Sequence, residues 1–517
     1  MISEKENNIA QKAINNAYNK IIPFKNIFLF TFFFGLFDHM FMFTNKLPNH
    51  DDVSSLFTKG TTIGSGRWAI GVFSFFFPNY SMPWVYGVFT VAVVSVCVCL
   101  ILKIFEIDGK ISKYIFSAIV VSSMFVVNTL AFMYTSVLYA TAFLLSILSV
   151  LFWTKKGVSY KIASVCCLVF SLGIYQAFIA VTASFLLLLL IKDIINKNDS
   201  VKNTILNGAY YLLLLIISLV FYYFITKGIQ LLASKPFNEY SKEAMTSGKN
   251  IFERIGSAYS MFILEFFHAE NYLAPSLISK ICHLAVLIVS LIGVALSFKK
   301  LDSVSKRITL CLIVLMLPIA IYCLAIFVNR SFVRAIMLWS YVSVYIFFFI
   351  ILKSVTGDHL SKRFAAAKNI TALLLSIIVL SNIYSANAVY LRLNVKYEHV
   401  HSYYTTLITR IQMTEGYDED TKLLFIGDKS ASDTLYPYGE FDRLGIDINE
   451  MDFYVDLYSY KKFIKYYIGF NAKFEKDDVE EQIINEVIKT EEYKKMGIYP
   501  YENSVKKIND YMVVRFS

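Results

Sequence analysis

Two neighbouring carboxylates and a nearby arginine stand out in a chain that is otherwise strongly apolar. Asp51 and Asp52 follow His50 in a polar segment, and Arg67 comes shortly after, behind Gly66. A carboxylate within hydrogen-bond reach can take a proton from an attacking hydroxyl, and a guanidinium suits bidentate contact with a phosphate. The residue types and their spacing predict a polar site that combines a general base with an anion-binding group.

The pattern leaves open which carboxylate acts. Asp51 or Asp52 would be the base, and its neighbour would orient the acceptor or raise the pKa of the base through like charge. The competing interpretation is a solvated loop in which Asp52 caps a short helix at 53–59. For Arg67 the competing interpretation is a side chain that extends from the bilayer edge to water.

Composition assigns the class of protein. The 517 residues are 56% hydrophobic and 17% charged, whereas soluble domains average roughly 45–50% apolar and about 25% charged residues. We therefore expect a polytopic α-helical membrane protein.

The charge is distributed unevenly along the chain. Residues 1–391 carry 32 basic and 16 acidic residues, a net charge of +16. Residues 392–517 carry 17 basic and 23 acidic residues, a net charge of −6. No basic patch with interleaved aromatic residues indicates nucleic-acid binding, so no nucleic-acid partner is expected.

Apolar stretches of membrane-spanning length predict about eleven transmembrane helices between residues 26 and 391. The expected spans are 26–44, 83–102, 114–132, 134–153, 159–175, 177–192, 204–226, 277–298, 308–328, 335–353 and 369–389. Lysines and arginines gather in alternate loops, which places the N-terminus in the cytoplasm. An amphipathic helix within 1–25 would lie on that surface. Frequent Lys, Asn and Ile indicate a bacterial chain, and hence the cytoplasmic (inner) membrane.

Three segments would then face outward: the loops 45–82 and 227–276 and the tail 392–517. Residues 249–267 have the pattern of a helix lying in the interface. The tail shows strand patterns at 423–428 and 511–516 and a helical pattern at 477–496. It is expected to form a small extracytoplasmic α+β domain.

Other polar side chains lie near the expected outer ends of spans. Arg330 and Arg334 flank a short outward turn, where they would bind an anion or anchor the chain at the interface. Asp38 and His39 lie inside the first span, so they would face a cavity or sit at the interface. Gln176, at a hairpin, would hydrogen-bond a sugar or the backbone of its own turn.

The loop before the eighth span offers a different chemistry. Glu265, His268 and Glu270 could bind a metal, contact an acceptor or form a solvated face. All seven cysteines lie in or beside apolar spans, so neither a disulfide framework nor a cysteine metal site is expected. No cofactor is expected; a divalent metal is possible but the sequence does not require one.

Three motifs together carry a family resemblance. They are the acidic pair Asp51-Asp52, the pair Gly66-Arg67 with the apolar run from Trp68 to residue 77, and Tyr175-Gln176 at a span boundary. In these three places the chain resembles the glucosyl transferase family II. These GT-C-type membrane enzymes decorate O-antigen and related cell-envelope glycans. The resemblance is clearest over residues 27–180. That family usually has an arginine shortly after the acidic pair. This chain has none there, since residues 53–56 are Val-Ser-Ser-Leu.

The resemblance implies a GT-C-like bundle that takes a hexose, usually glucose, from a polyprenyl phosphate, typically undecaprenyl phosphate. The acceptor would be a lipid-linked or polymeric glycan outside the cytoplasm, and the transfer an inverting single displacement. No nucleotide sugar is available there, and the chain shows neither a GxGxxG nor a P-loop motif. Arg67, Arg330 and Arg334 would bind the donor phosphate. Further substrate-contact candidates are Asp38, His39, His50, Trp68, Gln176, Glu265 and His268.

Two other classes compete with this interpretation. A lipid-linked oligosaccharide flippase or exporter would carry charged residues near the middle of several spans, but here the polar residues gather at the outer face. A polysaccharide polymerase or ligase would use arginine-rich central loops rather than an acidic pair in the first loop.

Overall fold

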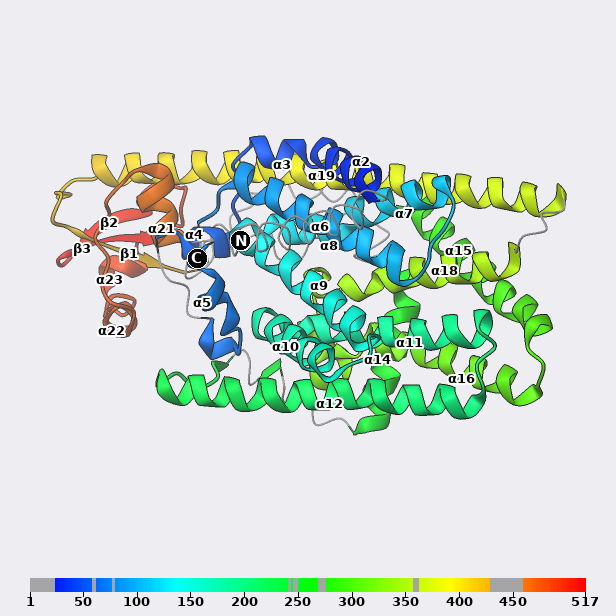
Figure 1. Cartoon of the computed structure of the whole chain (residues 1–517). Helices are drawn as coiled ribbons and strands as arrows, with labels where there is room; N and C mark the ends of the chain where they lie inside the picture. Colours follow the sequence, from blue (N-terminus) through cyan, green and yellow to red (C-terminus); the bar gives the residue numbers. More distant parts are fainter. Residues whose placement is uncertain are drawn as a thin grey trace, which may run out of the picture.

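The protein is mainly helical, with a small mixed unit at one end of a helical bundle (Figure 1). The structure is a computed structural model that describes residues 24–57, 62–76, 80–239, 243–244, 250–267, 276–356, 362–427 and 459–517. The amphipathic segment expected before the first span lies almost entirely outside these residues.

Ten apolar helices of the described residues form the main part of the bundle. They are α6 (Pro83–Ile104), α7 (Lys110–Ser122), α8 (Met124–Ala131), α9 (Met133–Trp153), α10 (Val158–Ile174), α11 (Ile179–Asn196), α12 (Val201–Leu232), α15 (Leu277–Ser297), α16 (Val304–Ile321) and α18 (Val342–Thr356). In the described part of the chain, eight helical stretches are long and apolar enough to cross a membrane, and two shorter apolar helices accompany them. The chain is a polytopic helical membrane protein; the number eleven stays a prediction.

Several of the expected spans are interrupted, among them the first and the third. The first is divided into α2 (Lys25–Asp38) and α3 (Met40–Thr44), which meet at His39. The third is divided into α7 and α8 because Ser123 adopts an extended conformation. The breaks lie close together, since Nε2 of His39 is 2.9 Å from the backbone oxygen of Val121.

Shorter helices frame the ends of the bundle. They are α4 (His50–Ser55), α5 (Ala69–Phe73), α14 (Ile251–Phe267) and α17 (Leu324–Phe327). Helix α14 falls where the sequence predicted an amphipathic segment at 249–267. The loop that carries α4 and α5 lies beside the C-terminal unit at one end of the bundle (Figure 1).

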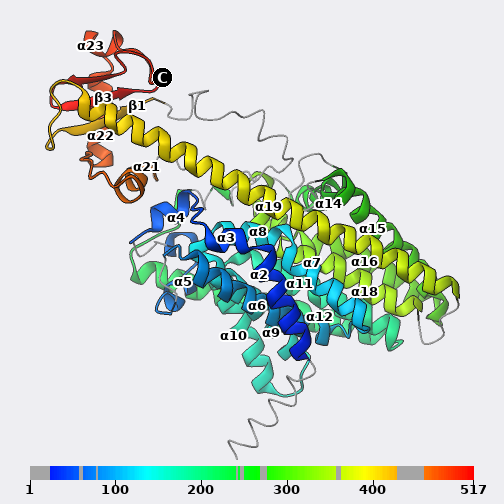
Figure 2. The same ribbon diagram turned by 90° about the horizontal axis from the view of Figure 1, so that it is seen from above.

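One helix of 52 residues, α19 (Lys362–Met413), runs along the bundle and continues into the C-terminal unit (Figure 2). Its sequence contains neither glycine nor proline, so nothing interrupts the helix where the apolar residues give way to polar ones. The expected boundary between membrane domain and tail, after residue 391, therefore falls inside a continuous helix.

The C-terminal unit holds a three-stranded sheet in the order β1-β3-β2. Strand β1 (Lys422–Ile426) is parallel to β3 (Tyr511–Arg515), and β2 (Val505–Ile508) is antiparallel to β3. Helices α21 (Tyr460–Phe463), α22 (Asp477–Val487) and α23 (Glu491–Lys494) complete it. The single helix expected at 477–496 is wrong, because the chain leaves the helix after Val487 and Thr490 caps a new one.

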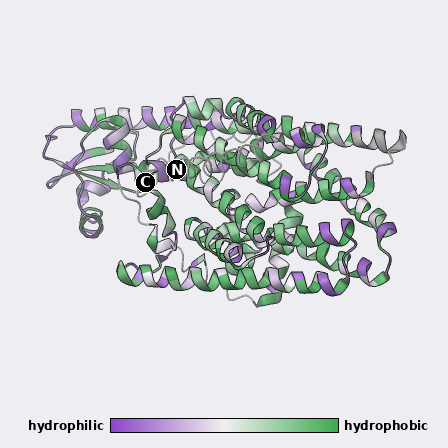
Figure 3. Cartoon of the chain, in the orientation of Figure 1, coloured by the Kyte–Doolittle hydropathy of each residue, from purple (hydrophilic) through white to green (hydrophobic). Residues whose placement is uncertain are grey.

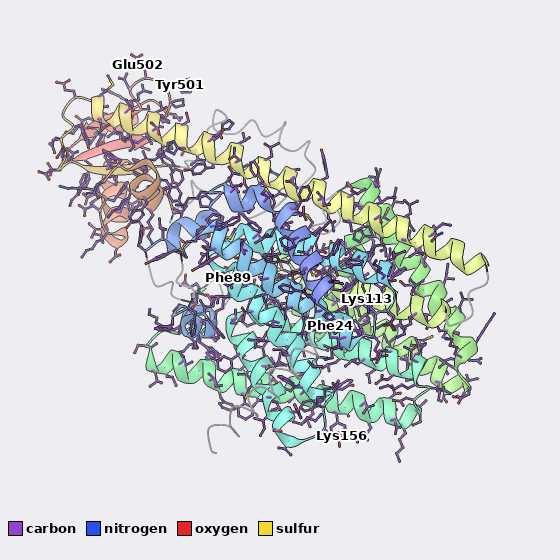
Figure 4. The ribbon with its side chains drawn as sticks, turned by 45° about the horizontal axis from the view of Figure 1, so that its top comes forward. Phe24, Phe89, Lys113, Lys156, Tyr501 and Glu502 are labelled. Atoms are coloured by element: carbon purple, nitrogen blue, oxygen red, sulfur yellow. The ribbon has the colours of Figure 1, made fainter. Side chains whose placement is uncertain are left out.

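Hydropathy and charge distinguish the two ends of the bundle. The C-terminal unit is markedly more hydrophilic than the helices (Figure 3). Lys113 and Lys156 lie on the far side of the bundle from Tyr501 and Glu502 (Figure 4). We call the end beside the C-terminal unit the site end, because it also holds Asp51, Asp52 and Arg67.

Candidate active site

Asp52 is a fully buried carboxylate that joins the first polar loop to the bundle. One oxygen accepts a hydrogen bond from the backbone N–H of Asn49 at 3.1 Å, while the Asn49 side chain accepts from the Asp52 N–H at 2.8 Å. The other oxygen accepts from the backbone N–H of Tyr134, in the first turn of α9, at 2.9 Å. Asn49 therefore caps α4 in a reciprocal capping box. The competing interpretation, in which Asp52 caps a helix at 53–59, is wrong in its cap and its bounds, because Asn49 caps a helix at His50–Ser55.

The same bonds decide what Asp52 can do chemically. Burial raises the pKa of Asp52 to about 7, although the N–H groups of Asn49 and Tyr134 favour its charged form. Both oxygens are already occupied by backbone donors. Asp52 is therefore well suited to fix the loop and poorly placed to accept a proton from a substrate.

Asp51 is the neighbour that remains accessible. Its side chain is 36% exposed, and its Oδ1 lies 3.9 Å from Nε2 of His50. The His50 ring packs edge-on against Phe132, at a centroid distance of 6.3 Å. Successive residues of a helix are about 100° apart around its axis, so adjacent aspartates at the start of α4 point in different directions. Of the pair, Asp51 is the carboxylate that a substrate can reach.

Arg67 is held by two tyrosines. Its Nη1 donates to the hydroxyl of Tyr139 at 3.2 Å, and its guanidinium carbon lies 4.4 Å from the ring centre of Tyr175. The two rings are stacked at 4.7 Å and 8°. Burial alone would lower the pKa of Arg67, but the tyrosines and the charge of Asp51 raise it, so the guanidinium stays charged. Its Nε is buried without a hydrogen-bond partner in the described structure.

The turn before Arg67 is bound to α12. Gly66 has φ +72°, and a Cβ there would lie 2.6 Å from the hydroxyl of Tyr222 and 2.8 Å from Nε2 of Gln176. Nε2 of Gln176 donates to the Ser65 carbonyl and to the Tyr222 hydroxyl, both at 2.7 Å, and Tyr222 donates to the Gly66 carbonyl at 3.1 Å. Only glycine fits this close approach. Gln176 was expected to bind a sugar or the backbone of its own turn; instead it binds the backbone of the first polar loop, at Ser65.

The C-terminal unit covers the other half of the loop. Val53 belongs to the hydrophobic cluster formed by α19 and α21, which includes Tyr404 and Phe463. Nζ of Lys462 donates to the Ser54 carbonyl. Burial, and then the charge of Asp52, raise the pKa of Tyr467. Asp52 is thus enclosed between the bundle and the C-terminal unit, while Asp51 stays partly exposed.

Asp38 and His39 lie apart from this site. His39 is fully buried, and its Nδ1 is 2.8 Å from the hydroxyl of Tyr390 in α19. The Asp38 carboxylate is also buried, 3.8 Å from Nε2 of His39. The structure therefore contradicts their assignment as substrate contacts or interfacial residues, because neither side chain reaches a surface.

Trp68 is also a packing residue rather than a substrate contact. It is 8% exposed, and its ring fills the space over Gly173, where a Cβ would come within 2.7 Å of the indole. It packs edge-on against Phe170 at 5.5 Å. This corrects its assignment as a substrate contact.

Arg330, Arg334 and Glu265 border a second region, around α14. Nη1 of Arg330 is 3.5 Å from the Ser260 hydroxyl, and Arg334 precedes a 3-10 turn that packs on α8. Glu265 is buried and interacts with Tyr322. His268 and Glu270 lie outside the described residues. Within the described ranges, no three His, Cys, Asp or Glu side chains are grouped as metal ligands would be.

Several contributors to the site were not identified from the sequence. Tyr139 and Tyr222 were hidden among 35 tyrosines, and no local pattern distinguishes them. The spacing Asn49-x-x-Asp52 is a capping-box pattern and could have revealed the structural role of Asp52. Tyr467 is more than four hundred residues from the loop, and no local signal links the two.

Fold and site together define a polytopic membrane protein with a carboxylate–arginine site in its first polar loop. The family profile of the glucosyl transferase GtrII matches residues 40–352, which include this loop, and the chain belongs to that family. No curated protein and no solved structure matches the chain. Family membership supports a role in glucosyl transfer by a membrane-embedded protein.

The two aspartates should differ in their effect on stability. Asp52→Asn replaces one acceptor oxygen by an amide that faces a backbone N–H, so the free energy of unfolding should fall by about 1–3 kcal/mol. Asp51→Asn, at a partly exposed position, should change it by less than about 0.5 kcal/mol. Unfolding of the purified variants in detergent measures both. An equal loss in both variants would contradict the roles assigned here.

Proposed function

We propose that the protein transfers glucose from a polyprenyl phosphate, such as undecaprenyl phosphate, to a glycan acceptor of the bacterial cell envelope. The observation that carries this proposal is the pairing of accessible Asp51 with tyrosine-held Arg67 in one loop, itself fixed by buried Asp52. Family membership supports the glucosyl group. The lipid donor and the acceptor are parts of the proposal.

In the proposed mechanism, Asp51 takes the proton from the acceptor hydroxyl as its oxygen attacks the anomeric carbon. The new bond forms as the bond between that carbon and the phosphate oxygen breaks, and the configuration inverts. Arg67 binds the departing phosphate, whose charge grows in the transition state. The proton on Asp51 is then released to water, or to the polyprenyl phosphate as it leaves.

We further propose that this chemistry takes place outside the cytoplasm, at the outer face of the bacterial inner membrane. Lys113 and Lys156, which belong to two of the lysine-bearing loops, lie at the end of the bundle away from Tyr501 and Glu502 in the C-terminal unit (Figure 4). The positive-inside rule places that end in the cytoplasm and the C-terminal unit outside. The N-terminus would then be cytoplasmic, as an odd number of spans requires.

We propose that no cofactor is needed for this reaction. The charge of Arg67 neutralises the donor phosphate where a divalent metal would otherwise do so, with Arg330 and Arg334 as further candidates. Activity that disappears in chelator and returns with a divalent ion would overturn this part.

Transfer of labelled glucose from undecaprenyl phosphate–glucose to envelope glycan extract tests the proposal. Asp51→Asn should reduce the rate by about 10²–10⁴-fold at unchanged folding, because the general base is lost. Asp52→Asn, corrected for folded protein, should retain clearly more activity. Wild type that transfers no hexose from any polyprenyl phosphate, or full activity in Asp51→Asn, would contradict the proposal.

Arg67→Lys tests the phosphate role. Lysine keeps the charge but loses the planar group that donates to the Tyr139 hydroxyl and packs on the Tyr175 ring, so kcat/KM for the donor should fall by about tenfold or more. The matched control is Arg307→Lys, because within the described residues Arg307, in the first turn of α16, donates to the Leu301 carbonyl and not to a residue of the site. Equal activity in the two variants would exclude Arg67 as the phosphate ligand.

A further inference from the structure

An apolar groove of about 600 Å³ runs between α11, α12 and α16. Its walls are almost entirely aliphatic, and Ile179, Leu190, Gly208, Leu219 and Ile313 are among the lining residues. The three helices lie side by side along the bundle (Figure 1). Only Thr204, Thr309 and Tyr211 add polar atoms to the lining. Such a groove suits a hydrocarbon chain rather than a sugar.

One end of the groove adjoins the site. Ile179 begins α11 directly after the turn that holds Gln176, and Leu219 lies about one helical turn before Tyr222 in α12. Gln176 and Tyr222 are the side chains that bind the loop before Arg67. A lipid whose phosphate contacts Arg67 would therefore have the start of its chain at this mouth of the groove.

The groove is longer than one leaflet is deep. Its lining on α12 extends from Thr204 to Leu219, which at 1.5 Å per residue is about 22 Å. The hydrocarbon core of a bilayer is about 30 Å thick, so the acyl chains of one leaflet reach only about 15 Å. The length favours a single long chain over the chain of an ordinary phospholipid.

We propose that this groove binds the polyprenyl chain of the lipid phosphate donor, with the phosphate at Arg67. The proposal rests on the proposed function and adds the binding site of the lipid. The chain enters beside Ile179 and runs toward Gly208 at the other end. Ordinary phospholipid is the alternative occupant, and the experiment below distinguishes the two.

Gly208 offers a direct test because it lines the far end of the groove. A Cβ there would lie 3.6 Å from Cδ1 of Leu190, an ordinary contact, so Gly208→Phe fills the groove rather than straining the helix. Gly228→Phe is the matched control on the same helix, because a Cβ at Gly228 meets nothing within 4 Å. Ala183→Phe fills the groove near its mouth.

The experiment compares kcat/KM for glucose donors on undecaprenyl phosphate and on geranyl phosphate, whose short chain ends near the mouth. Gly208→Phe should lower the value for the undecaprenyl donor by about tenfold, the loss expected from displacing a few buried methylenes, and leave the geranyl donor unchanged. Ala183→Phe should impair both donors, and Gly228→Phe neither. Gly208→Leu is a milder variant of the same design in case the phenylalanine disturbs folding.

The assignment of the groove would be overturned if Gly208→Phe and Gly208→Leu each lowered kcat/KM equally for the two donors. It would also be overturned if neither variant changed kcat/KM for either donor. Native mass spectrometry of the same proteins with undecaprenyl phosphate alone separates this failure from failure of the proposed function. Binding that is about tenfold weaker in Gly208→Phe and unchanged in Gly228→Phe supports the groove even if wild type transfers no glucose. Equal affinity for undecaprenyl phosphate in Gly208→Phe and wild type would overturn the proposal, and so would a wild type that binds only phospholipid.

Discussion

The buried carboxylate of Asp52 is the contact on which the geometry of the site depends. Its two oxygens accept backbone N–H groups from Asn49, before α4, and from Tyr134, at the start of α9. A negative group suits the N-terminus of a helix, where several N–H groups have no partner inside the helix. Through this one side chain the first polar loop is fixed to a membrane helix, and Asp51 is thereby oriented.

The rest of the loop is fixed from two directions. Gln176 and Tyr222 hold the turn at Gly66, and the tyrosines of α9 and of the α10–α11 turn hold Arg67. From the other side, α19 and α21 bury Val53 in the core of the C-terminal unit. A carboxylate and a guanidinium are thus presented by short elements whose backbone positions are set by rigid helices. Catalytic groups need this kind of preorganisation.

The sequence was most informative where composition and local pattern decide the structure. The membrane class follows from hydropathy, and residue type and spacing were enough to propose the acidic pair and Arg67 as a site. Asp38 and His39 were misjudged because an ionisable residue inside a span usually indicates function, whereas here His39 bridges a helix break to Val121 and Tyr390. Trp68 was misjudged because a residue beside the candidate arginine need not share its exposure. Contacts between distant segments, such as Tyr467 with the first loop, have no local pattern that could predict them.

The division of roles between Asp51 and Asp52 is the central claim, and chemical rescue tests it most directly. Glycine at position 51 removes the proposed base and leaves space for a small carboxylate, so formate should restore glucosyl transfer in Asp51→Gly. In Asp52→Gly, formate should restore little of the transfer activity, because that variant loses the contact that positions the loop and keeps the proposed base, Asp51. Rescue of Asp52→Gly alone, or an Asp51→Gly variant that needs no formate, would contradict the account.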